Sequence, residues 1–227
     1  MNLADLSASV LAVVRGTDPD AALDCVLALA EGGISGIEVS LTTPDALRVI
    51  ERARRALGDT ALLGAGTVLT AADAARAAGA GARFLVTPAV VATGQWDPSA
   101  RELPVLMGAL TPSEITTAMA RGALAVKLFP ASLGGPAYLR ALRDPLPGVP
   151  FVPVGGVGLD EARAYLAAGA VTVGVGSPLV GDAARGGDLD ALRARIARWR
   201  TALTEETALA EETARTEETA RTEETAA

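Results

Sequence analysis

One lysine stands out among the residues whose chemistry could serve a reaction. The chain of 227 residues holds 20 Lys and Arg residues, and Lys127 is the one lysine among them. Arginine can replace lysine in most surface and anion-binding roles, but it stays protonated and cannot act as an amine nucleophile. Lys127 lies inside an apolar run, residues 124–130 (LAVKLFP). This setting predicts attack of its amine on a ketone to form a Schiff base; a snorkelling surface lysine is the alternative.

Glu38 lies in a similar apolar run, residues 36–41 (GIEVSL). Alternation along a strand sends the aliphatic neighbours to one face and the side chains of Glu38 and Lys127 to the other. Because an isolated buried charge is costly, we expect the two to pair or to carry function. Glu38 is then the group for the proton transfers of imine formation and carbon–carbon cleavage. A purely structural ion pair is the alternative, although it gains little over aliphatic residues.

The chain contains no histidine and a single cysteine, Cys25. This composition removes the commonest metal ligand, the commonest general base and any internal disulfide. We therefore expect no metal and no cofactor. Tyr138 and Tyr165 are the other candidates for proton transfer, but both lie in helical stretches away from the strand ends.

The charge balance limits the partners. A net charge of −7 and 3% aromatic residues argue against nucleic acid and anionic membrane surfaces. No apolar run approaches the roughly 20 residues of a membrane span, and the N-terminal segment lacks the basic region of a signal peptide. We expect a cytoplasmic protein that acts on a small molecule.

Short β-branched runs alternate with Ala-, Leu- and Arg-rich helical stretches. Strands are predicted at residues 10–15, 36–41, 61–66, 82–87, 103–108, 124–129, 150–155 and 171–176. Helices are predicted at residues 19–32, 44–57, 71–80, 112–121, 159–168 and 188–203. This alternation implies parallel βαβ units and predicts a single-domain α/β fold, a (β/α)8 TIM barrel over residues 1–203. An open doubly wound sheet is the alternative.

Residues 204–227 form a separate tail that repeats a Thr/Glu/Ala/Arg unit and has one large apolar residue, Leu209. A six-residue period drifts around a helix and makes no continuous apolar stripe. The tail is predicted to be solvated or partly helical. A natural low-complexity segment and an added one fit equally well.

Active residues of such barrels gather where the strands end. Arg15 ends the first predicted strand and Thr67 follows the third. A cation such as Arg15 near the lysine, together with burial, favours the neutral amine that attacks a ketone.

Glycine-rich turns follow the last two predicted strands. Gly155 and Gly156 belong to the first turn, and Gly176 and Ser177 to the second. Such turns expose backbone N–H groups, and barrels often bind phosphate at this pair of loops. The sequence therefore predicts a phosphate site, to which residues 134–136 (GGP) could add a contact.

Residues from about 10 to 180 resemble the 2-keto-3-deoxy-6-phosphogluconate (KDPG) aldolases, which also act on 4-hydroxy-2-oxoglutarate (KHG). The matching segments are GIEVSLTTP (36–44), GAGTVLT (64–70), FLVTPAV (84–90), LTPSE (110–114), VKLFPAS (126–132), PVGGV (153–157) and VGVGSPLV (173–180). The order and spacing of these segments cover most of the predicted barrel.

The resemblance implies a class I aldolase that yields pyruvate and glyceraldehyde 3-phosphate, without a metal, as a homotrimer. It assigns the Schiff base to Lys127 and the acid/base role to Glu38. The remaining roles it implies are pyruvate contacts for Arg15, Thr67 and Pro88, packing beside the lysine for Phe129, and phosphate binding for Gly155, Gly156 and Ser177.

Two departures concern the substrate. Thr42 replaces an arginine found in many members, and Val154 replaces a threonine that contacts substrate hydroxyls. Val154-Gly155-Gly156 and Arg15-Gly16 look more like the related 2-keto-3-deoxy-6-phosphogalactonate aldolases. Two other hypotheses are a phosphosugar isomerase or epimerase on the same fold, which the lack of histidine disfavours, and a structural or assembly subunit.

Overall fold

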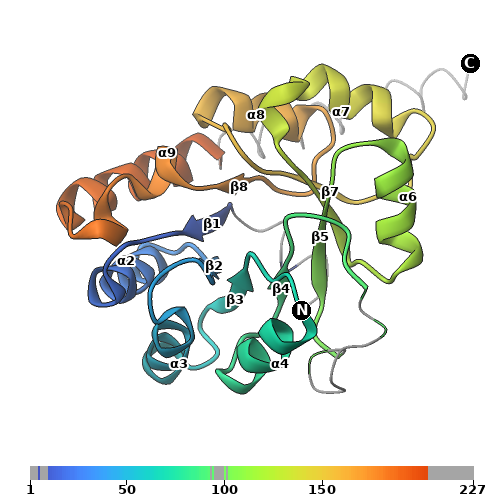
Figure 1. Cartoon of the computed structure of the whole chain (residues 1–227). Coiled ribbons are helices and arrows are strands. Elements are labelled where there is room, and N and C mark those ends of the chain that lie inside the picture. The colour runs from blue at the N-terminus through green and yellow to red at the C-terminus, as the bar shows by residue number, and fades with distance from the viewer. Residues whose placement is uncertain (1–4, 6–9, 93, 95–99, 101, 204–227) are drawn as a thin grey trace, which may run out of the picture.

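Eight parallel strands form one sheet whose spatial order follows the chain (Figure 1). The computed structural model describes residues 5, 10–92, 94, 100 and 102–203. The predicted tail, residues 204–227, lies outside the described residues. The strands are β1 (Leu11–Val14), β2 (Gly36–Ser40), β3 (Leu62–Gly66), β4 (Leu85–Val86), β5 (Val105–Ala109), β6 (Ala125–Leu128), β7 (Phe151–Pro153) and β8 (Gly174–Val175). Each lies within a strand predicted from the sequence, except that β5 runs one residue further.

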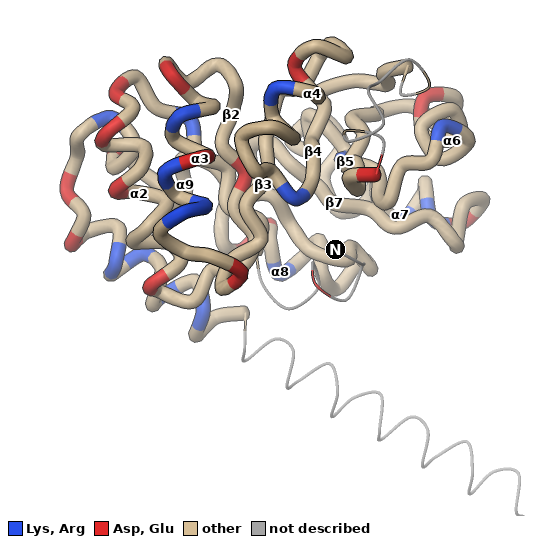
Figure 2. Tube along the Cα trace, turned by 90° about the horizontal axis from the view of Figure 1, so that it is seen from below, with Lys and Arg blue, Asp and Glu red and all other residues tan. Residues whose placement is uncertain are grey.

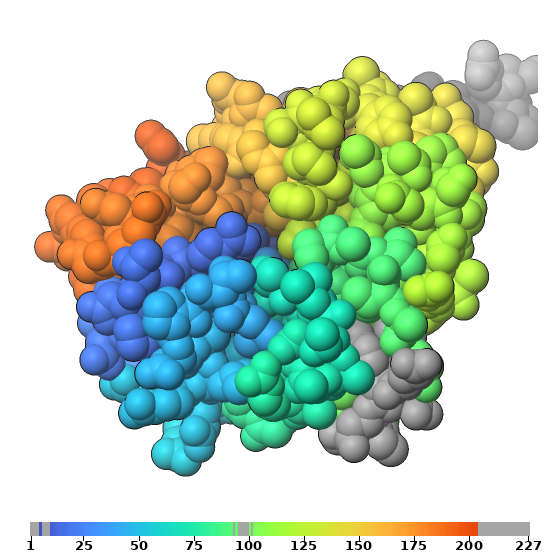
Figure 3. Space-filling model, viewed as in Figure 1, coloured from blue at the N-terminus to red at the C-terminus, as the bar shows by residue number. Residues whose placement is uncertain are grey.

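The sheet closes on itself. β1 pairs with both β2 and β8, and a single parallel bridge between Val154 and Gly174 joins the β7 side to β8. The colours of Figure 3 run around the molecule from blue through green to orange, which brings the last elements beside the first. The predicted TIM barrel is confirmed, and the open sheet is excluded.

Helices surround the strands (Figure 1). They are α2 (Pro19–Glu31), α3 (Ala46–Leu57), α4 (Ala71–Gly79), α6 (Pro112–Ala120), α7 (Gly135–Arg143), α8 (Leu159–Ala167), the short α9 (Ser177–Val180) and a last helix over residues 189–203, with 3₁₀ turns η2 (Ala131–Leu133) and η3 (Ala183–Arg185). Asp18 caps α2, and Thr70 and Thr111 form capping boxes with Asp73 and Glu114.

The predicted start of α3 at residue 44 is two residues early. The helix begins at Ala46, and the Thr43 hydroxyl accepts a hydrogen bond from the Gly16 N–H instead of capping the helix. Thr43 therefore connects the loops after β1 and β2, at the end of the barrel where site residues were predicted. The sequence alone does not show from which backbone N–H a hydroxyl near the start of a helix will accept a hydrogen bond.

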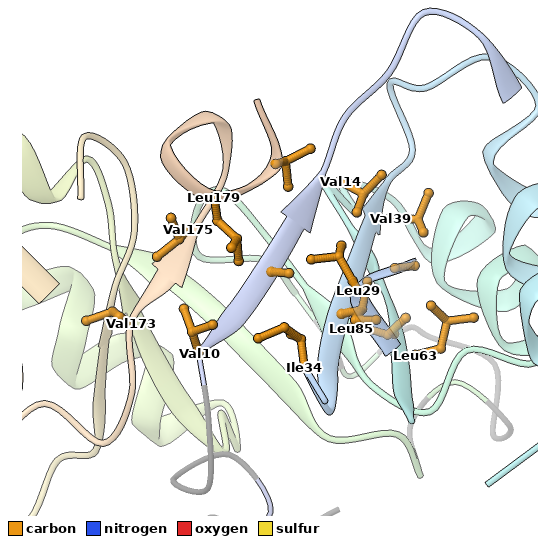
Figure 4. Packing of buried hydrophobic residues seen from close by; sticks show 14 of the residues in the cluster. Val10, Val14, Leu29, Ile34, Val39, Leu63, Leu85, Val173, Val175 and Leu179 are labelled. Atoms are coloured by element: carbon orange, nitrogen blue, oxygen red, sulfur yellow. The ribbon is translucent and has the colours of Figure 1, made fainter. Parts of the chain in front are cut away.

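The buried apolar side chains form two clusters, because side chains alternate between the outer and inner faces of the barrel along each strand. The larger packs the outward side chains, such as Val14, Val39 and Leu63, against the helices (Figure 4). The smaller fills the barrel interior and consists of Leu11, Phe84, Val86, Leu106, Ala125, Val152 and Val154. Ile37 and Val39 belong to the outer cluster, which leaves Glu38 between them facing inward.

Glycines on β3 make room for larger groups inside the barrel. A Cβ on Gly64 would lie 2.5 Å from the Phe84 ring, and one on Gly66 would lie 2.8 Å from a Glu38 carboxylate oxygen. Both distances are too short for a real side chain. The interior therefore accommodates the Phe84 ring and the Glu38 carboxylate because β3 carries no side chain at these two positions.

Charged residues lie along the outer helices, for example α2 and α3 (Figure 2). Most described ion pairs there are exposed, such as Arg55–Glu51, and contribute little to stability. Within the described residues, no helix has the length and apolar character to cross a membrane. In contrast to these exposed ion pairs, the pair of Glu38 and Lys127 is buried inside the barrel.

Candidate active site

Lys127 and Glu38 meet inside the barrel. The Lys127 Nζ lies 3.7 Å from the Glu38 Oε1, and the two side chains are 8% and 3% exposed. Their strands are not neighbours: Glu38 comes from β2 and Lys127 from β6, and the barrel brings them together across its interior. The Nζ also lies 5.4 Å from the centre of the Phe129 ring, in the range of a cation–π contact.

Burial raises the pKa of the Glu38 carboxyl above its ordinary value, while the charges of Lys127 and Arg15 act in the opposite direction. The second carboxylate oxygen, Oε2, is buried and has no hydrogen-bond partner in the described structure. A carboxyl in this setting takes up a proton more readily than one in water. Glu38 can therefore accept and return a proton beside the amine.

A cavity of about 610 Å³ opens above this pair. Nine of the residues singled out in the sequence line it: Arg15, Thr67, Pro88, Lys127, Phe129, Gly155, Gly156, Gly176 and Ser177. Glu38 does not line the cavity and lies behind Lys127, close to Gly66. The structure thus brings all the candidate residues into one place, from loops and strands far apart in the sequence.

The cavity carries positive charge in an acidic protein. Arg15, Lys127 and Arg185 are the charged residues among the described ones that line it. Neither guanidinium has a carboxylate within ion-pair distance in the described part of the chain. The two guanidinium groups, with no carboxylate lining the cavity beside them, suit a ligand with more than one negative charge.

The glycine-rich turns form one wall of the cavity. Gly155 and Gly156 have φ values of +97° and +73°, which side chains rarely adopt, and a Cβ on Gly156 would lie 2.8 Å from Ser132. No described carbonyl oxygen accepts a hydrogen bond from the N–H groups of Gly155, Gly156 or Ser177. These N–H groups are therefore free to bind an anion such as phosphate.

The two tyrosines considered for proton transfer are engaged elsewhere. The Tyr138 hydroxyl donates to the Leu110 carbonyl at 2.9 Å, and the Tyr165 hydroxyl donates to the Ala131 carbonyl at 2.7 Å. Neither tyrosine lines the cavity. Among the described residues, no cluster of three or more His, Cys, Asp or Glu side chains could hold a metal ion.

Sequence reasoning missed Arg185, which lies in η3 beyond the second glycine turn. One arginine among so many gives no local signal, and η3 reaches the cavity only because it packs on the loop after β1. There a Cβ on Gly16 would lie 2.0 Å from the Ala184 carbonyl oxygen. Ser40 was also missed; its hydroxyl bonds to those of Thr42 and Thr67 at 2.8 and 2.9 Å.

The fold and the cavity together define a barrel enzyme with a buried amine at the centre of its site. Residues 5–194 match the family model of the KDPG and KHG aldolases. The chain belongs to this family. It is an aldolase, and hence a carbon–carbon lyase, of the class I KDPG/KHG type.

Two curated relatives differ in the sugar acid they are named for. A probable 2-dehydro-3-deoxy-6-phosphogalactonate aldolase of Rhizobium meliloti is 38% identical over 79% of this chain and 85% of its own length. A 2-dehydro-3-deoxy-phosphogluconate aldolase of Pseudomonas aeruginosa is 41% identical over 62% of this chain and 64% of its own length. The comparison does not separate the two substrate series.

Two solved structures share the fold. The KDPG aldolase of Legionella pneumophila, captured with pyruvate as a covalent carbinolamine, has a TM-score of 0.76 and 30% identity over 86% of this chain and 95% of its own. A cube-shaped protein cage designed by fusing symmetric oligomeric domains has a TM-score of 0.84 and 30% identity over 93% of this chain and 77% of its own.

Proposed function

We propose that the protein cleaves 2-keto-3-deoxy-6-phosphogluconate to pyruvate and glyceraldehyde 3-phosphate, with Lys127 as the Schiff-base lysine. The observation that carries the proposal is the buried Lys127–Glu38 pair at 3.7 Å beneath a cavity lined by cations and free glycine N–H groups. The covalent carbinolamine formed with pyruvate in the Legionella enzyme supports it, since a carbinolamine is the adduct of an amine and a ketone.

The pair can carry the whole reaction. The neutral Lys127 amine attacks the C2 carbonyl of the substrate, and Glu38 supplies the proton with which the carbinolamine loses water to give an iminium. Glu38, deprotonated by that step, takes the proton of the C4 hydroxyl, and the C3–C4 electrons move into the iminium as the aldehyde leaves. Glu38 gives that proton to C3 of the resulting enamine, and water then adds to the iminium and passes a proton to the Glu38 carboxylate as pyruvate and the free lysine are released.

The residues that line the cavity suit the two anionic groups of this substrate, a carboxylate and a phosphate. In this proposal Arg15 and Thr67 hold the keto acid carboxylate near the lysine. The N–H groups of Gly155, Gly156 and Ser177 hold the phosphate in this proposal, which their lack of a backbone acceptor supports, and Arg185 adds a positive charge to the cavity. Pro88 and Phe129 complete the apolar wall around the pyruvate part of the substrate.

The phosphogalactonate epimer is the second candidate substrate, and one observation favours it. Val154 lines the cavity at the turn after β7, where it offers no hydroxyl to the substrate C4 hydroxyl. Cleavage of both epimers, and of unphosphorylated 4-hydroxy-2-oxoglutarate, would be compared by pyruvate release. Lys127→Arg serves as the inactive control because a guanidinium cannot form the imine.

The proposal expects the highest kcat/KM for the phosphogluconate epimer. It also expects Arg185→Gln to lower kcat/KM for the phosphorylated substrate more than for 4-hydroxy-2-oxoglutarate. A higher kcat/KM for the phosphogalactonate epimer would assign the second candidate. No cleavage of any of the three by folded protein would overturn the proposal.

We also propose a homotrimer that works in the cytoplasm without a metal. The likeness to a cage component built from symmetric oligomeric domains supports a symmetric assembly. Light scattering coupled to size exclusion would test it: the proposal expects three times the mass of one chain, and the mass of one chain or of a large cage would contradict it. Treatment with EDTA is expected to leave cleavage unchanged.

A further inference from the structure

The Ser40 hydroxyl lies beneath the cavity without lining it. Ser40 ends β2, two residues beyond Glu38 on the same inward face, and is 0% exposed. Its Oγ lies 2.8 Å from the Thr42 Oγ1 and 2.9 Å from the Thr67 Oγ1. Both threonines line the cavity together with Lys127. One buried hydroxyl thus connects two hydroxyls that reach the substrate space.

Thr67 has an unusual backbone conformation. Its φ of +61° is in the left-handed region, which is unfavourable for a β-branched residue. The next residue is fixed by a 3.1 Å hydrogen bond from the Val68 N–H to the Val86 carbonyl. In this conformation the Thr67 hydroxyl lies within hydrogen-bond distance of the Ser40 hydroxyl. A strained position of this kind persists only where the surrounding structure determines it, and such positions cluster at functional sites.

The hydroxyls of Thr42, Ser40 and Thr67 have one proton each, and this limits the directions in which they can donate hydrogen bonds to one another. Each hydroxyl donates one hydrogen bond, and the Ser40 oxygen also accepts one from the Thr42 N–H at 3.4 Å. Ser40 therefore accepts from one threonine and donates to the other. When Ser40 donates to Thr67, the Thr67 proton is left free to point into the cavity.

An anion beside the lysine selects this direction. Thr67 follows Gly66, whose backbone lies against the Glu38 carboxylate, which in turn lies 3.7 Å from the Lys127 Nζ. Thr67 and Lys127 also line the same cavity, in which the keto acid must react. A carboxylate there can only accept hydrogen bonds, so it requires Thr67 as a donor.

We propose that Ser40 is a positioning residue that makes the Thr67 hydroxyl a hydrogen-bond donor to the carboxylate of the substrate bound at Lys127. The inference rests on the proposed function for the identity of that carboxylate. Ser40 itself does not touch the substrate. It acts by donating its own proton to the Thr67 oxygen, which leaves the Thr67 proton for the substrate carboxylate.

Borohydride trapping at a series of pyruvate concentrations tests this role. We expect Ser40→Ala to raise the pyruvate concentration for half-maximal trapping about tenfold, the value of one hydrogen bond to a charged group. The rate of borohydride trapping at saturating pyruvate should change less than about threefold. Ser40→Thr, which keeps a hydroxyl, should restore binding, and Thr172→Val, which removes a buried hydroxyl before β8, should leave it unchanged.

A double-mutant cycle with Thr67→Val shows whether Ser40 acts through Thr67. If it does, Ser40→Ala adds little to the loss already caused by Thr67→Val. Should Ser40→Ala not fold, Ser40→Cys, with its weak S–H donor, replaces it in the cycle. Wild-type affinity in the folded Ser40 variant, or fully multiplicative losses, would overturn the inference. Failure of the wild-type protein to trap pyruvate would instead count against the proposed function.

Discussion

Glu38 is the group of the buried pair that can take up and release a proton. Its pKa is raised by burial, and Lys127 and Arg15 lower it less than burial raises it. The carboxyl can therefore hold a proton beside the Lys127 amine. An aliphatic residue at position 38 would avoid the burial cost but could not move the proton. This cost is the physical argument against a merely structural ion pair.

Replacing Glu38 with glutamine keeps the shape of the side chain and removes its ability to accept a proton. We expect kcat to fall by roughly 10²–10⁴-fold while pyruvate still binds, which steady-state assays and trapping would measure together. Loss of the folded state in Glu38→Gln, seen by circular dichroism, would show that the pair is needed for structure and would contradict the account.

The raised pKa of Glu38 has a definite sign for stability. The native protein holds this proton more tightly than the unfolded chain does, whose ordinary pKa is 4.5. The stability that this proton gives the folded protein is thus fully present below pH 4.5. It is lost as the pH rises through the pKa of Glu38 in the folded state. A ¹³C titration of the carboxyl carbons, assigned with Glu38→Gln, should give a midpoint above 4.5. A midpoint below it would refute the effect of burial.

The strands and their alternation account for what the sequence could predict. All eight strands and the inward direction of Glu38 follow from the short β-branched runs and their alternation. The sequence predicted a barrel but kept an open sheet as the alternative, and the pairing of β1 with β8 shows the closure. The short β4 and the start of α3 were placed less well, because loop hydrogen bonds decide such boundaries. Arg185 was missed because contacts between loops far apart in sequence bring it to the cavity. Ser40 was missed because its hydroxyl meets that of Thr67, which is 27 residues away in the sequence.

The contact between β3 and Phe84 gives a prediction for the barrel interior. Gly64→Ala would place a Cβ 2.5 Å from the Phe84 ring, which is fully buried. We expect this overpacking to lower the free energy of unfolding by about 1–3 kcal/mol. Gly79→Ala, at the end of α4 with no atom within 4 Å of the new Cβ, is the matched control and should be neutral or stabilising. Equal effects of the two changes in urea unfolding would contradict this view of the core.

For the whole molecule, the barrel domain alone should carry the activity. Every residue assigned a role lies between Arg15 and Arg185, well before the repetitive tail at residues 204–227. Deleting the tail is expected to leave kcat/KM unchanged in a pyruvate-release assay. A loss of more than about tenfold would show that the tail contributes to the site or to an assembly on which the site depends.

The presence of a single lysine makes the central claim open to one direct measurement. Only the Lys127 amine and the N-terminal amine can form an imine with pyruvate. Incubation with pyruvate and borohydride, followed by intact mass and peptide mapping, is expected to show one reduced pyruvyl adduct on the peptide that contains Lys127. No adduct on Lys127 in folded protein would contradict the account and leave Lys127 a structural residue.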